Sequence, residues 1–132
     1  MPDFETSRGA ARAPEPTAGP SLTFDLPQQI RDLRQEPYWQ SGRNSKTLIK
    51  YDDFRIVLTA IRENTTIHEH QTAGRMSFQA LEGHLRMHAG EREFDLPAGR
   101  VLVLDRCMPY DVVASEDSAY LLTIAWPEEA QH

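Results

Sequence analysis

Thr66-Ile67-His68-Glu69-His70-Gln71 is the stretch of this sequence that decides the fold, because it holds two histidines one residue apart. On an extended strand, residues i and i+2 project from the same face. We therefore expect the side chains of His68 and His70 to lie side by side on one strand. A β-barrel builds a metal site from imidazole pairs placed in this way. The two histidines are our candidate metal ligands.

Outward from this stretch, the sequence alternates with a period of two from Ser45 to its end. Turn formers such as Asp52-Asp53, Glu82-Gly83 and Pro97-Ala98-Gly99 separate the alternating runs. Many short strands at even spacing are typical of a sandwich or barrel. We therefore predict one all-β domain over residues 45–132. The expected strands are residues 47–51, 55–62, 76–81, 85–87, 92–96, 101–104, 111–114 and 120–126.

The residues before this domain have a different character. Residues 1–21 are rich in proline and poor in apolar residues, which predicts a disordered tail. Asp25 is a helix N-cap, and the helix must end before Pro37. We predict that residues 22–44 form a short helix and a connection that packs on the outside of the barrel, anchored by Trp39. The apolar residues at helical spacing are Leu26, Ile30 and Leu33.

Composition limits the classes of function. The chain has 132 residues, which suits one domain, and a formal net charge of -6, which argues against a nucleic-acid or anionic-membrane partner. The single cysteine, Cys107, excludes an internal disulfide and fits a reducing compartment. No apolar run is long enough for a signal peptide or a membrane span. We therefore expect a cytoplasmic protein.

The spacing of the glycine and proline landmarks resembles the two sequence motifs of the cupin superfamily. The first motif holds His-x-His, a glutamate about four to five residues later, and a glycine at the next hairpin; the second holds Pro-x-Gly and a histidine after a proline. The resemblance covers residues 48–126 and implies a double-stranded β-helix, or jelly roll, that assembles as a homodimer. The matching residues are His68, His70, Gly83, Pro97-Ala98-Gly99 and Pro109.

Two of the four ligand positions of that family carry other residues here. The glutamate position falls on Arg75, which cannot bind a cation, and the histidine of the second motif falls on Tyr110. The histidine pair alone would hold nickel, zinc, copper or iron only weakly. A shift of the register by one residue would instead bring Asp111 or Gln71 to the site.

The same resemblance implies a polar barrel interior. If the histidines point inward, Arg75, Ser77 and Gln79 do so as well, at a period of two, together with Tyr110. Unpaired buried polar groups cost about 1 to 3 kcal/mol each, so such an interior is expected to be wet or occupied. The guanidinium of Arg75 suits a carboxylate or a phosphate. In the alternative, Arg75 only forms an ion pair at the rim, with Glu69 or Glu82.

Three functions remain open from the sequence. The first is a module that binds a small anionic metabolite through Arg75, Ser77, Gln79 and Tyr110. The second is a metal-dependent enzyme of the dioxygenase or isomerase type, with the histidine pair as ligands. The third is a purely structural role with a filled interior. A fold alone does not choose among these functions.

Overall fold

The computed structural model of the chain describes residues 20–69 and 72–126. Every predicted strand is present, and the all-β fold with one short helix is confirmed. The first strand begins at Arg43 rather than at residue 47, so the barrel starts before its predicted boundary. The elements are α2 (Leu26–Gln35), the short 3-10 helix η1 (Pro37–Ser41), β1 (Arg43–Lys50), β2 (Phe54–Ile61), β3 (Thr66–Glu69), β4 (Arg75–Glu82), β5 (His84–Ala89), β6 (Arg92–Pro97), β7 (Val101–Leu104), β8 (Tyr110–Ala114) and β9 (Ser118–Ala125).

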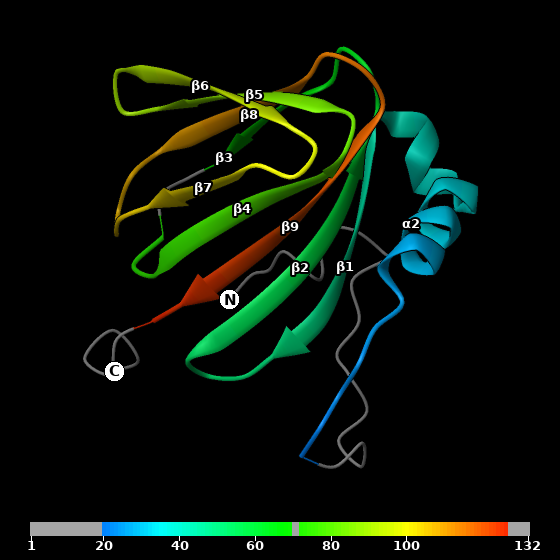
Figure 1. Cartoon of the computed structure of the whole chain (residues 1–132), viewed down its shortest axis with the longest axis horizontal. Helices are drawn as coiled ribbons and strands as arrows, with labels where there is room; N and C mark the ends of the chain where they lie inside the picture. Colours follow the sequence, from blue (N-terminus) through cyan, green and yellow to red (C-terminus); the bar gives the residue numbers. More distant parts are fainter. Residues whose placement is uncertain (1–19, 70–71, 127–132) are drawn as a thin grey trace.

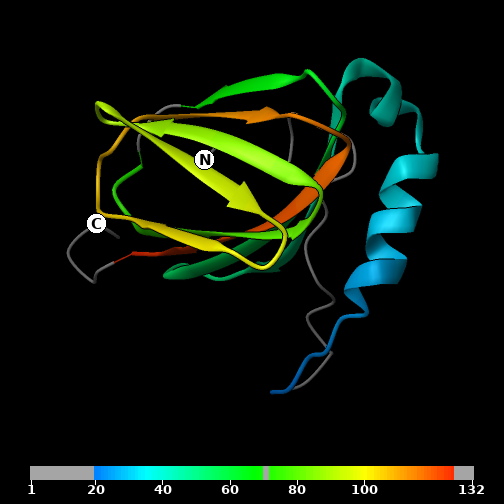
Figure 2. The same cartoon turned by 45° about the horizontal axis from the view of Figure 1, so that its top comes forward.

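Two antiparallel sheets enclose the core. The larger sheet has the strand order β1-β2-β9-β4-β7, and the smaller has the order β3-β8-β5-β6. Neighbours that are distant in sequence, such as β2 and β9, mark the crossovers of a jelly roll. The smaller sheet lies above the larger one in Figure 1, and the turned view in Figure 2 shows the two sheets facing each other, with α2 outside them.

Helix α2 covers part of the outer face of the larger sheet, beside β1 and β2 (Figure 1). It starts where predicted, because the Asp25 carboxylate accepts a hydrogen bond of 3.2 Å from the backbone N–H of Gln28. Ile30 and Leu33 are buried against the sheet, and Trp39 packs beside them, so the predicted packing is confirmed. This helix is not long and apolar enough to cross a membrane, nor is any other that the structure describes.

The hairpin glycine of the first motif has a clear structural role. Gly83 joins β4 to β5 with a φ of 79°, a backbone conformation that suits glycine. A Cβ at this position would collide with the Ser118 hydroxyl and the Asp117 carbonyl. The same hydroxyl accepts a hydrogen bond of 3.0 Å from the backbone N–H of His84. Gly83 therefore lets β9 approach the β4–β5 turn closely.

Candidate functional site

Strand β4 has the opposite phase to the one that the resemblance implied. Arg75 and Gln79 are exposed and Ser77 is half-buried, because all three lie on the outer face of the larger sheet. The prediction that they face the barrel interior is therefore wrong. Successive side chains alternate across a strand, so an error of one residue turns the whole set outward. The apolar residues between them fill the core: Met76, Phe78 and Ala80.

Arg75 forms an ion pair at the rim. Its Nε lies 3.0 Å from Asp105 Oδ1, and both side chains are exposed. The pKa of Asp105 is lowered, first by a hydrogen bond from the backbone N–H of Arg106 and then by Arg75. The partner differs from the acidic residues considered from the sequence, since Glu82 pairs with Arg34 at 2.9 Å.

His68 also lies on an outer face, that of the smaller sheet. Its side chain is 76% exposed, and its Nδ1 lies 3.0 Å from Asp111 Oδ1. The preceding residue, Ile67, points into the core instead. His70 and Gln71 lie outside the described residues, and within those residues no group of three or more His, Cys, Asp or Glu side chains could hold a metal ion. The described residues therefore do not fit a metal centre at His68.

Tyr110 does face the barrel interior, as the resemblance implied. It is buried, and its ring packs edge to face with the ring of Phe78, with the ring centroids 4.8 Å apart. In the register of the sheet it lies opposite Glu69 on one side and Ala89 on the other. Its position is confirmed, and its role in binding a ligand stays a prediction.

The polar residues of the interior lie on β1 and β2, two strands for which the sequence predicted no site residue. Cross-strand partners share a face of a sheet, and Val57 and Ile61 of β2 belong to the core between the sheets. Their partners on β1 are Thr47 and Arg43, which therefore face the same interior. We call the inward-facing polar residues of these strands the inner polar stripe. It consists of Arg43, Ser45, Thr47, Arg55 and Thr59.

Burial makes the inner polar stripe unusual. The hydroxyls of Ser45 and Thr59 are 2.9 Å apart and hydrogen-bond to each other. Thr47 is fully buried, and its hydroxyl has no hydrogen-bond partner among the described residues. The guanidinium carbon of Arg55, also buried, lies 5.1 Å from the ring centroid of Trp126. Buried polar groups normally find partners, so the Thr47 hydroxyl marks a place where a ligand or water would be stabilised.

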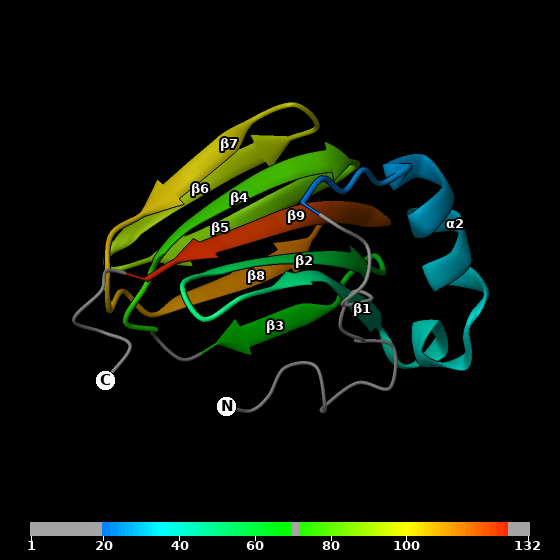
Figure 3. The ribbon, with the colours of Figure 1, turned by 90° about the horizontal axis from the view of Figure 1, so that it is seen from below.

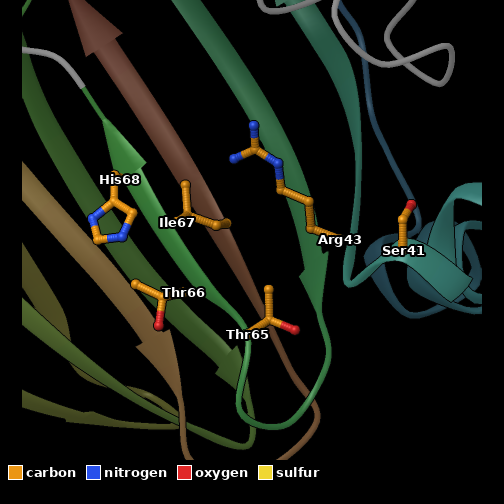
Figure 4. Close-up of a pocket in the computed structure, with 6 residues that line it drawn as sticks. All are labelled: Ser41, Arg43, Thr65, Thr66, Ile67 and His68. Atoms are coloured by element: carbon orange, nitrogen blue, oxygen red, sulfur yellow. The ribbon is translucent and has the colours of Figure 1, made fainter.

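A pocket of about 290 Å³ opens between the edge strands β1 and β3, at the Arg43 end of the stripe. We call it the seam pocket. Figure 4 shows Arg43 extending from β1 while Thr65 and Ile67 project into the space between the two strands; Thr66 and His68 lie on the other face of β3. The pocket is lined by Ser41, Arg43, Thr65, Thr66, Ile67 and His68.

The chemistry of the stripe and the pocket favours negative charge. Arg43 and Arg55 supply cationic donors, and the remaining members supply hydroxyls. The inner polar stripe itself contains no acidic residue. An anion bound here would meet donors from two adjacent strands of a sheet.

A signal for this site was present in the sequence. Arg43, Ser45 and Thr47 alternate at a period of two, and so do Arg55 and Thr59 with Val57 between them. The other phase of both strands holds Leu48, Leu58 and Ala60, which lie under α2. When a strand is covered on both faces, apolar residues occupy its outer positions as well. The alternation of polar and apolar residues that would identify its inner face is then lost.

No protein-family model and no curated protein matches this chain. Several solved structures are similar. A conserved protein of unknown function from Streptococcus pyogenes matches with a TM-score of 0.70 at 20% identity, over 89% of this chain and 97% of that chain. A cupin superfamily protein from Desulfitobacterium hafniense matches with a TM-score of 0.62 at 16% identity, over 64% and 78%.

A third similar structure is a longer enzyme. Salicylate 1,2-dioxygenase from Pseudoaminobacter salicylatoxidans matches with a TM-score of 0.69 at 14% identity, over 83% of this chain but 38% of the dioxygenase chain. Another structure of that enzyme is a complex with gentisate. Likeness at these identities establishes the fold, and the site has to be argued from this chain's own residues.

Proposed function

Since the chain has the cupin fold, we propose that it is a cupin-like protein that binds a small anionic metabolite inside the barrel, along the inner polar stripe. The observation that carries the proposal is the buried hydroxyl of Thr47, which lacks a partner among the described residues and faces the same interior as Arg43. The ligand is the anion expected from the sequence, whereas the binding residues are new.

Arg43 is the anchor in this proposal. It lies on the inner side of the edge strand β1 and borders the seam pocket, so a ligand that enters between β1 and β3 meets its guanidinium first. A guanidinium makes paired, charge-assisted hydrogen bonds to a carboxylate or phosphate. The chain as a whole carries a net charge of -6, whereas the inward-facing Arg43 places a positive charge at the proposed site.

The hydroxyls of the stripe would hold the rest of the ligand. Thr47 has one hydrogen bond to give, and the Ser45–Thr59 pair retains further acceptor and donor capacity. The volume of about 290 Å³ is near the lower limit for small-molecule pockets, which favours a compact acid over a nucleotide. Salicylate and gentisate are suitable first probes, because the similar dioxygenase has been seen with gentisate.

Isothermal titration calorimetry with salicylate, gentisate and inorganic phosphate tests the proposal, with a metal chelator present throughout. We expect at least one of these anions to bind the parent protein. Arg43→Met should weaken that binding at least tenfold, because a hydrogen bond to a charged group contributes about 1.5 to 3 kcal/mol.

Arg75→Met is the matched control, since it removes an arginine from the outer face of the same sheet. It should bind each anion as the parent does. The proposal fails if none of the anions binds, or if the Arg43 and Arg75 variants lose the same affinity. A loss of anion affinity in the Arg75 variant alone would instead support a site formed by the residues expected from the sequence.

The metal-dependent enzyme is not the function that we propose. His68 is exposed and ion-paired on an outer face, and the described residues do not assemble a set of ligands around it. A guanidinium beside the seam pocket would also repel a divalent cation.

A further inference from the structure

Two histidine–aspartate pairs lie on the outer face of the smaller sheet. His68 Nδ1 lies 3.0 Å from Asp111 Oδ1, and His84 Nε2 lies 2.8 Å from Asp95 Oδ1. Of these two pairs, the first borders the seam pocket, because His68 is one of the residues that line it, and the second does not. A surface ion pair contributes little to stability, so the distinguishing property of the His68 pair is its place beside the pocket.

The seam pocket extends around the free edge of β3. This strand pairs with β8 on one side only, and Figure 3 shows it along the lower margin of the barrel. Thr65 and Ile67 line the pocket from the inner face of the strand, and Thr66 and His68 line it from the outer face. Arg43 lines the opposite side, on β1. A ligand in the pocket therefore lies between a guanidinium and an imidazole.

Asp111 determines which nitrogen of His68 carries the proton. A carboxylate only accepts hydrogen bonds, so the Nδ1–H of His68 donates to Asp111. In a neutral imidazole the other nitrogen, Nε2, is then an acceptor. Nε2 has no hydrogen-bond partner among the described residues. Since Nδ1 points towards β8, Nε2 points away from that strand. His68 thus presents an acceptor at the rim of the pocket.

The charges beside the pocket orient an acid that enters it. Arg43 on β1 attracts a carboxylate, whereas Asp111, behind His68 on the other side, repels one. The carboxylate of the ligand is therefore expected at the β1 side. The opposite end of the ligand meets His68 Nε2, which forms a hydrogen bond only with a donor. The hydroxyls of Thr65 and Thr66 both donate and accept, so they do not impose this choice.

We propose that the seam pocket selects acids that carry a hydroxyl group at the end opposite their carboxylate. Arg43 binds the carboxylate, and His68 Nε2 accepts a hydrogen bond from the hydroxyl. This inference rests on the proposed function, because it names the class of acid for the same site. His68 is in this account a specificity-determining residue, and Asp111 is a positioning residue that fixes the tautomer of its imidazole.

The exposure of His68 sets the size of the preference. Its side chain is 76% exposed, so Nε2 is hydrated when the pocket is empty. The hydroxyl of the ligand replaces a water molecule, and only the difference between the two hydrogen bonds contributes to affinity. We therefore expect a hydroxylated acid to bind about three- to tenfold more tightly than an acid of the same shape without the donor.

Isothermal titration calorimetry with matched benzoates tests the inference, at about pH 8 so that imidazoles are neutral, and with a metal chelator present. The probes are 3- and 4-hydroxybenzoate, each compared with the fluorobenzoate substituted at the same position, which has a similar shape and no donor. At least one hydroxybenzoate should bind the parent more tightly than its fluorinated match. His68→Phe should remove that preference without abolishing binding, and His68→Gln, which keeps an acceptor, should retain part of it.

Two further variants separate this role from a structural one. Asp111→Asn removes a negative charge and leaves the tautomer of His68 undetermined, so it should raise the affinity for every benzoate and reduce the hydroxyl preference. His88→Phe is the matched control. His88 lies on the other side of Asp111 in the register of the sheet, is exposed, and is not one of the residues that line the pocket. It should behave as the parent.

The inference is overturned if neither hydroxybenzoate is preferred, if His68→Phe keeps the preference, or if His88→Phe loses it as well. It is also overturned if none of the benzoates binds. The proposed function is judged separately, on salicylate, gentisate and phosphate, and it stands if one of those anions binds through Arg43 while the hydroxyl preference is absent.

Discussion

The two flanks of the barrel interior are built from different side chains. Around β4 and β8 the interior is a closed apolar core, in which Phe78 lies against Tyr110 and Tyr120. Along β1 and β2 the same interior carries Arg43 and Thr47, with the seam pocket at one end. The apolar flank supplies stability, and the polar flank is where we propose that the anion binds. In this account the site lies where polar residues interrupt the core.

Phe78→Ala should produce the largest effect on folding. The side chain is fully buried between the sheets and contacts two aromatic rings, so its removal leaves a cavity that the strands cannot close. We expect a loss of about 3 to 5 kcal/mol in the free energy of unfolding, measured by chemical denaturation. A loss below about 1 kcal/mol would show that the apolar flank is not the stabilising half of the interior.

Thr47→Val should act in the opposite direction. Valine keeps the shape of the side chain and removes a buried hydroxyl that has no partner among the described residues. Without ligand, we expect the free energy of unfolding to rise by about 1 kcal/mol, because an unsatisfied buried group is costly. The same variant should bind the anionic probes more weakly in calorimetry. A variant that loses stability would mean that the hydroxyl is satisfied in the folded protein.

The smallest effect is expected on the outer face of the smaller sheet, where charges are exposed. His84 Nε2 lies 2.8 Å from Asp95 Oδ1, and the pKa of Asp95 is lowered chiefly by this hydrogen bond. A carboxyl with a lowered pKa contributes stability above its unfolded value, about 3.9, and that contribution is lost as the pH falls through the lowered value.

Denaturant unfolding at several values between about pH 5 and about pH 2 measures this contribution. His84→Ala should slightly reduce the loss in the free energy of unfolding as the pH falls over this range. The control is His88→Ala, which removes an exposed histidine of the same strand and should leave that loss unchanged. Identical profiles for the parent and the His84 variant would show that the ion pair does not contribute to stability.

The sequence predicted the fold more fully than the site. Period-two alternation and glycine or proline turns identified the strands, and Asp25 marked the start of the helix, because these signals are local. The landmarks Gly83 and Pro97 to Gly99 placed the strands in a jelly roll. These signals are sufficient to predict that the strands exist and in which order they occur, and they do not depend on which face of each strand is buried.

The same local sequence signals do not show which face of each strand is buried. The family motifs, matched by residue type, predict that Arg75 and His68 face inward, but a register that differs by one residue turns every side chain to the other face. The sequence does not single out the inner polar stripe, because α2 covers the other face of β1 and β2 and that face is apolar as well. Tertiary burial on both sides of a strand removes the alternation on which the prediction depends.

The most direct test of the central claim is an NMR titration of the isotope-labelled protein with gentisate or salicylate, in the presence of a metal chelator. If the anion binds along the inner polar stripe, the resonances of Arg43, Thr47 and Thr59 should shift with the titration, and those of Gln79 on the outer face should stay in place. Shifts centred on Arg75, Ser77 and Gln79, or the absence of shifts at saturating anion, would contradict the account.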